Sequence, residues 1–156
     1  MLIGRSPGIP GNSFLVSQEE VSDFILKLSV RLRPDAGNSG VQFRSEALEG
    51  GAVKGYQADI GEGWWGSLYD EHGRGLLVDG YKGKGDKAVR KGQWNDYVIR
   101  AIRDHIQIEI NGTITTDIRD EGRRQGILAF QVHSGGPFEI AFKDVLLREI
   151  TRGAEQ

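Results

Sequence analysis

Almost every regular stretch of this chain alternates apolar and polar residues with a period of two, and none keeps the period of about 3.6 residues typical of a helix. The alternation is clearest from Phe24 to Arg33 and returns from Tyr97 to Ile110. Successive side chains of a strand point to opposite faces, so each such segment presents one apolar face to a core. About ten short strands joined by glycine-rich turns predict an all-β antiparallel sandwich or barrel.

Two local signals refine this prediction. Asn111-Gly112 stands between two alternating runs, as expected of a two-residue hairpin turn with positive φ angles. In the last predicted strand, residues 138–149, the apolar phase slips by one residue near Asp144, so that Val145 and Leu147 take over, which predicts a β-bulge. Trp94 opens an alternating strand and is therefore assigned to the core.

Composition limits the organisation and the partners of the chain. Its 156 residues fit one domain over residues 12–150, with an irregular Gly/Pro-rich segment at 1–11 and a tail at 151–156. A net charge of −2 argues against nucleic acid or an anionic membrane as a partner. The absence of cysteine excludes disulfides and thiolate metal sites. No signal peptide and no apolar run long enough to span a membrane is present.

Three predicted strands combine an apolar face with a polar one. Val41 and Phe43 alternate with polar residues, and the same holds for residues 55–60 and 127–133. The polar side chains are Gln42, Arg44, Gln57, Asp59, Gln131 and His133. A plain solvated face is one interpretation. The planar hydrogen-bonding groups favour a second interpretation, in which this face is the floor of a sugar-binding groove.

Aromatic residues lie next to this face in the sequence. Trp64 and Trp65 cannot both point inward if they lie on a strand, so at least one is expected at the rim of the groove. Tyr69 and Glu71 follow on the next extended segment and are assigned to the same site. Aromatic rings beside polar groups suit stacking on a sugar ring.

The histidines leave several chemistries open. His133 fits a general base, a metal ligand or a hydrogen-bonded structural residue. His72 follows Asp70-Glu71, and this cluster could hold a divalent cation, although its spacing matches no recognised metal motif. No metal ligand is therefore assigned.

Several segments together resemble the 3-keto-disaccharide hydrolase family. They are Asn38-Ser39-Gly40-Val41 with Arg44, residues 55–60, Gly66 to Tyr69, Trp94-Asn95 with Tyr97, residues 126–133 and residues 142–145. The resemblance covers about residues 12–150. It implies a concanavalin-like jelly roll with a concave carbohydrate-binding face, and an extracytoplasmic location.

The resemblance also implies a reaction. A ketone at C3 of a glycoside acidifies the hydrogen at C2, so a base can remove it and the C1 substituent departs, after which water adds. On this basis His133 is the expected base, Arg44 holds the developing oxyanion, and Asp59 takes part in catalysis. Gln42, Gln57 and Gln131 would bind the substrate with Trp64, Trp65, Tyr69 and Glu71.

One departure from the family pattern affects this assignment. The commoner family version has Glu and then Gln where this chain has Gln57 and Asp59, so the carboxylate is displaced by two residues on the same face. The alternative function is a non-catalytic, lectin-like glycan-binding module, because a fold alone does not imply catalysis. An interaction domain that uses the polar face to contact protein is a third possibility.

Overall fold

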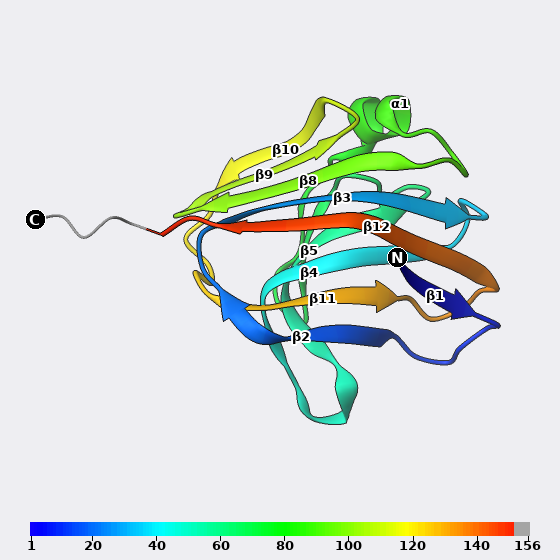
Figure 1. Cartoon of the computed structure of the whole chain (residues 1–156), viewed down its shortest axis with the longest axis horizontal. Helices are drawn as coiled ribbons and strands as arrows, with labels where there is room; N and C mark the ends of the chain where they lie inside the picture. The colour runs from blue at the N-terminus through cyan, green and yellow to red at the C-terminus, as the bar shows by residue number, and fades with distance from the viewer. Residues whose placement is uncertain (152–156) are drawn as a thin grey trace, which may run out of the picture.

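The computed structural model describes residues 1–151 and shows two antiparallel six-stranded sheets packed face to face (Figure 1). The first sheet has the strand order β1 (Leu2–Ser6), β12 (Phe138–Glu149), β3 (Phe24–Arg33), β8 (Asn95–Ile102), β9 (His105–Ile110) and β10 (Thr113–Arg119). The second has the order β2 (Ser13–Val21), β11 (Gly126–Val132), β4 (Asn38–Ala47), β5 (Val53–Gly61), β6 (Leu68–Glu71) and β7 (Gly75–Val78). The predicted all-β sandwich is confirmed.

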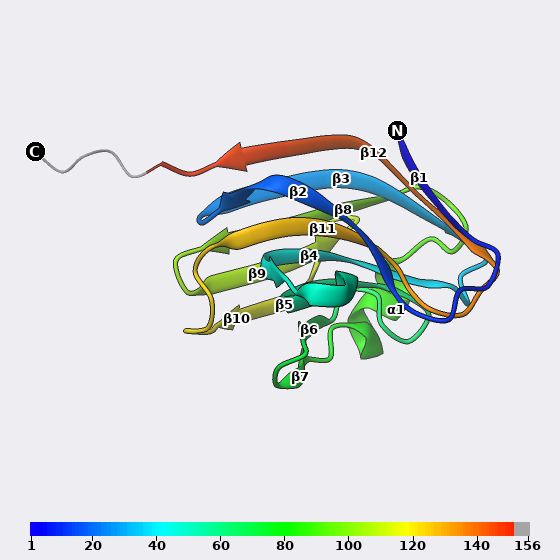
Figure 2. The same cartoon turned by 90° about the horizontal axis from the view of Figure 1, so that it is seen from below.

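Short helical turns connect some of the strands. A 3-10 turn spans Glu49–Gly51, a π-helical turn spans Tyr81–Gly85, and α1 spans Asp86–Ala88. Figure 2 shows the strands of the second sheet one below another, in the order β2, β11, β4, β5, β6 and β7. Within residues 1–151 no helix is long and apolar enough to cross a membrane.

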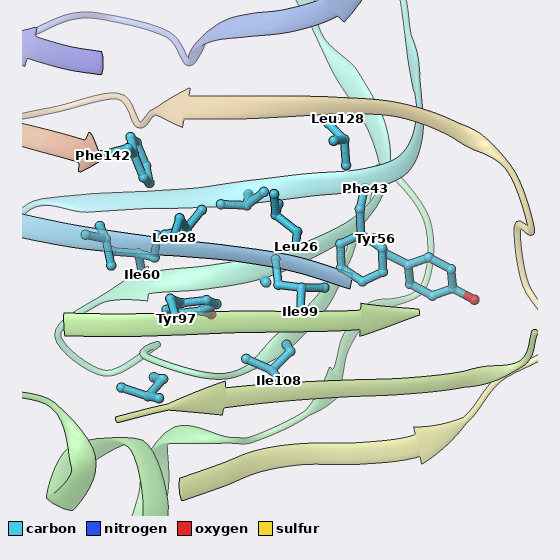
Figure 3. Close-up of a cluster of buried hydrophobic side chains, with 14 of the residues drawn as sticks. Leu26, Leu28, Phe43, Tyr56, Ile60, Tyr97, Ile99, Ile108, Leu128 and Phe142 are labelled. Atoms are coloured by element: carbon cyan, nitrogen blue, oxygen red, sulfur yellow. The ribbon is translucent and has the colours of Figure 1, made fainter. Parts of the chain in front are cut away.

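The core lies between the two sheets and consists of the apolar sets predicted from the alternation (Figure 3). Leu26 and Leu28 of β3 point into it from the first sheet, and Phe43 and Tyr56 from the second. The rings of Phe43 and Tyr56 stack with their centroids 5.4 Å apart. Because the inner faces of both sheets are apolar, the polar residues of β4, β5 and β11 are left to the outer face of the second sheet.

Both local signals are confirmed. Asn111 and Gly112 have φ angles of 48° and 85° and join β9 to β10. Asp144 has a φ of 51°, and the pairing of β12 with β3 shifts between Lys143 and Leu146. A second irregularity was not predicted: Arg44 has a φ of 47°, and the pairing of β4 with β5 shifts between Phe43 and Glu46.

Two predictions are wrong. The segment 1–11 is not irregular throughout, because Leu2–Ser6 forms β1 and pairs with Phe138–Phe142, a tertiary contact that local composition does not reveal. Trp94 is not in the core; it is partly exposed, with the Arg31 guanidinium 4.7 Å and the Lys143 amine 4.2 Å from its ring centre. Trp94 is in phase with Asp96 and out of phase with the buried Tyr97, so the alternation of β8 places it on the outer face. Apart from Thr151, the predicted tail lies outside the described residues.

Candidate functional site

Polar residues of the second sheet are brought together by the strand register. Gln42 of β4 lies opposite Gln57 of β5, and Gln57 lies opposite Tyr69 of β6. In the next row, Asp59 lies opposite Gly40. Directly opposite residues point to the same face of a sheet, so these side chains form one polar patch on its outer side.

Gly40 provides the space that this patch needs. A Cβ atom at position 40 would lie 2.7 Å from each of three Gln57 side-chain atoms, Cγ, Cδ and Nε2. The Gln57 side chain therefore occupies the volume that any other residue at position 40 would fill. Because it leans over Gly40, Gln57 reaches both Asp59 and Gln131.

A chain of hydrogen bonds orients the buried amides. The Ser45 hydroxyl donates to Gln42 Oε1 at 2.7 Å, and Gln42 Nε2 donates to Gln57 Oε1 at 2.8 Å. Gln57 Nε2 then donates to Asp59 Oδ1 at 2.8 Å and to Gln131 Oε1 at 3.3 Å. Each of the three amide oxygens accepts a hydrogen bond, so the amide of Gln57 is held between Gln42, Asp59 and Gln131.

Asp59 ends this chain in an unusual environment. Asp59 is only 4% exposed, and its Oδ2 atom has no hydrogen-bond partner among residues 1–151. Burial penalises the carboxylate and raises the pKa of Asp59 to about 8; the hydrogen bond from Gln57 opposes the shift and Glu71 adds to it. At pH 7 the side chain is therefore mainly a neutral carboxylic acid, able to donate a hydrogen bond as well as accept one.

An open pocket of about 160 Å³ lies over Asp59. We call it the Asp59 pocket, and it is lined by Asn38, Gln57, Asp59, Trp64, Tyr69, Glu71 and His133. Its volume is below the roughly 300–1,000 Å³ of sites for drug-sized ligands, so it suits a group of about one sugar ring. Six of the ten site residues assigned from the sequence line it.

The aromatic wall consists of Trp64 and Tyr69. Their rings meet edge to face with centroids 6.1 Å apart, and Trp64 is 38% exposed. Trp65 does not line the pocket, contrary to its assignment as a substrate-binding residue: it is 1% exposed, and its Nε1 donates to Asp35 Oδ1 at 2.9 Å. The chain turns after Gly61, whose carbonyl accepts from the backbone N–H groups of both tryptophans, and of the two only Trp64 stays at the surface.

His133 reaches the pocket from the end of β11. Its backbone N–H donates to the Asn38 carbonyl at 3.2 Å, which brings the two residues to one side of the pocket. Its Nδ1 lies 2.9 Å from the Ser134 carbonyl oxygen. Since a carbonyl oxygen only accepts, Nδ1 carries the proton, and Nε2 of the neutral ring has a free lone pair. Asn38 was not singled out by sequence reasoning, although it lies in the Asn38–Val41 segment that resembles the family.

Arg44 is not in the pocket, and its predicted role in holding an oxyanion there is wrong. The irregularity at its positive φ turns the side chain away, and the residue is fully buried. Its guanidinium donates to the carbonyls of Ser22 and Arg103 at 2.8 and 2.7 Å and to Asp23 Oδ1 at 3.1 Å. Burial lowers the Arg44 pKa, and Asp23 opposes the shift. Arg44 thus ties the β2–β3 and β8–β9 connections together.

Gln42 and Gln131 support the pocket from behind. Both are buried and bonded to Gln57, and neither lines the Asp59 pocket. The suggested cation cluster at residues 70–72 is not formed, because Asp70 Oδ2 accepts from Arg74 Nε at 2.8 Å. Among residues 1–151, no three His, Cys, Asp or Glu side chains are grouped so that they could hold a metal ion.

The fold is shared with carbohydrate-related proteins. The chain superposes on carbohydrate-binding module CBM66 from Bacillus subtilis with a TM-score of 0.74 and 19% identity, over 94% of this chain and 86% of that one. A protein from Parabacteroides distasonis ATCC 8503 assigned as a glycosyl hydrolase gives a TM-score of 0.67 and 19% identity, over 96% and 90%. A Bacillus subtilis protein of unknown function with a galectin-like fold gives 0.69 and 10%, over 94% and 81%.

At these identities the superpositions establish the fold alone. No match was found among curated proteins. The profile of the 3-keto-alpha-glucoside-1,2-lyase-like domain matches residues 2–148, nearly the whole chain. On that match, the chain belongs to the 3-keto-alpha-glucoside-1,2-lyase-like domain family.

Proposed function

We propose that the chain binds one neutral sugar ring in the Asp59 pocket and cleaves glycosides that carry a ketone at C3. The observation that carries the proposal is the unpartnered Oδ2 atom of Asp59 at the floor of an open pocket with an aromatic wall. A buried polar atom without a partner costs about 1–3 kcal/mol. A hydroxyl or carbonyl group of a bound sugar would supply the missing partner.

The charge of the pocket supports an uncharged ligand. Of the described part of the chain, no Lys or Arg lines the pocket, whereas Glu71 does. An anionic sugar would meet a carboxylate without a compensating cation, which costs free energy at close range. Trp64 and Tyr69 offer the apolar surface on which the C–H face of a sugar ring packs.

The proposed reaction is an elimination. His133 Nε2 takes the C2 proton, which the C3 ketone has made acidic, and the electron pair of that bond forms an enolate. Asp59 donates a hydrogen bond to the enolate oxygen, a role for which a carboxylic acid held neutral by burial is suited. The C1–O bond then breaks, its oxygen takes the proton back from His133, and the ring keeps a C1–C2 double bond to which water can add.

These roles differ from the initial expectation in one respect. With Arg44 tied to Ser22, Arg103 and Asp23, the oxyanion is stabilised by Asp59 and not by a cation. That change also favours a second candidate, a binding module without catalysis, because a pocket that no Lys or Arg lines offers the enolate less stabilisation. A sugar-derived substrate fits the extracytoplasmic location implied by the family.

The experiment compares a disaccharide with its 3-keto derivative by NMR. The proposal expects an unsaturated sugar or its hydrate, with the released alcohol, from the keto form alone. His133→Gln should reduce kcat by about 10²–10⁴ while binding persists. Ile114→Ala, an exposed position on β10 of the other sheet, is the matched control. Binding of both sugars without turnover would establish the module instead, and no binding of either would reject both functions.

A further inference from the structure

The C-terminal half of β12 has one open edge. β1 pairs with β12 only from Phe138 to Phe142. Among residues 1–151, the rest of β12 pairs with β3 alone. Figure 1 shows β1 beside only the part of β12 that precedes the bulge. The backbone N–H and C=O groups on the other side are therefore free to pair with another strand.

Three consecutive apolar residues are exposed along this edge. Val145, Leu146 and Leu147 are 39%, 66% and 43% exposed. Leu147 lies opposite the buried Leu26 and so points toward the interior of the sandwich, while Leu146 lies opposite Lys27 on the outer face. An inward-facing residue of a sandwich is normally covered, and the exposure of Leu147 marks a missing neighbour.

The segment from Asp144 to Arg148 has an acidic residue at one end, a basic residue at the other and three apolar residues between them, so it is complementary to a second copy that runs in the opposite direction. Two copies that run antiparallel about a twofold axis at Leu146 place Val145 opposite Leu147, and they bring Asp144, at the bulge, next to Arg148. Both members of the charged pair lie on the outer face, since Asp144 borders the same hollow as Lys27 and Arg148 lies opposite Ile25. Neither makes an ion pair with another described residue.

We propose that two copies of this chain associate through their β12 edges, antiparallel and in register about Leu146. The contact is isologous, so Leu146 of one chain contacts Leu146 of the other. The pairs Val145–Leu147 and Asp144–Arg148 each occur twice. The charges also select the partner, because a foreign strand without the matching order would leave Asp144 or Arg148 opposite an apolar or like-charged residue.

The size of the contact sets the expected affinity. Five paired residues on each chain form an interface at the small end, below about 1,200 Å² in total. Interfaces of this size are typical of weak and transient contacts, so we expect a dimer with a dissociation constant of about a micromolar or weaker. Sedimentation equilibrium over a concentration range around this value measures it directly, and a wild-type chain that stays monomeric throughout would overturn the proposal.

The twofold axis at Leu146 permits a sharper test. Leu146→Glu places two carboxylates together and Leu146→Lys two amines, so each variant alone should be monomeric. An equimolar mixture of the two should dimerise again, because the introduced carboxylate of one chain then meets the introduced amine of the other. Leu76→Glu, which adds the same charge at another exposed leucine, should leave the dimer intact.

Each other result counts against the proposal. A dimer that persists in both single variants would place the contact elsewhere, and a mixture that stays monomeric would exclude this register. Sugar binding by the variants serves as the fold control, because Leu146 does not line the Asp59 pocket.

Discussion

Replacing Gly40 by alanine tests whether the empty space at this position holds the site together. The φ of Gly40 is not in the positive range, so alanine is sterically allowed by the backbone. The three atoms nearest to the added Cβ all belong to Gln57, at 2.7 Å. Gln57 must therefore move away, and its bonds to Gln42 and Asp59, both 2.8 Å long, are broken or weakened.

The expected cost follows from those bonds. Leaving buried partners unsatisfied costs about 1–3 kcal/mol, and each kcal/mol lowers the Tm of a domain of this size by about 2–4 °C. In a background that already carries Gln57→Ala, the clash no longer exists. There Gly40→Ala should cost nothing, or stabilise by about 0.5 kcal/mol through the unfolded state. Its effect thus depends on Gln57.

Urea unfolding followed by tryptophan fluorescence gives the four free energies of this double-mutant cycle, and the buried Trp65 is a suitable reporter. A coupling energy of about 1–3 kcal/mol between positions 40 and 57 is expected. If Gly40→Ala destabilised both backgrounds equally, the coupling would be zero. The explanation of Gly40 as space for Gln57 would then be wrong.

Further outcomes follow from the same geometry. Arg44→Met should lower the free energy of unfolding by about 3 kcal/mol, because the buried oxygen atoms that accept hydrogen bonds from the guanidinium would lose their donors. The folded variant should still bind sugar, as measured by calorimetry. The pKa of Asp59 is about 8 in the folded state and about 3.9 in the unfolded state. Between pH 4 and pH 8, roughly, the folded state therefore binds a proton that the unfolded state has lost, and the free energy of unfolding falls as the pH rises through this range. Asp59→Asn should remove that slope from pH-dependent unfolding curves. Trp64→Ala should weaken sugar binding at least tenfold, whereas Trp94→Ala, outside the pocket, should not; equal effects would place the stacking surface elsewhere.

The amino-acid pattern alone is sufficient for the fold class and for much of the candidate site. Period-two alternation requires strands, and it places Gln57 and Asp59 on one face because they are two residues apart. The bulge at Asp144 is visible as a slip in this phase, and the hairpin at Asn111-Gly112 as a local turn preference. These features are local, so sequence reasoning can reach them.

Features that depend on contacts between distant segments required the tertiary structure. By alternation alone Arg44 belongs to the polar face, but the irregularity at its positive φ turns it toward Ser22 and Arg103. β1 exists because β12 offers it an edge, although its own sequence resembles a loop.

The candidate site also combines features that the sequence predicts with features that only the tertiary structure provides. The alternation placed a carboxyl group at Asp59 on the polar face. Its neutral state at pH 7 depends on burial among residues from other strands, and on the space that Gly40 leaves for Gln57. Desolvation is a property of the packed environment and has no counterpart in the order of residues along the chain.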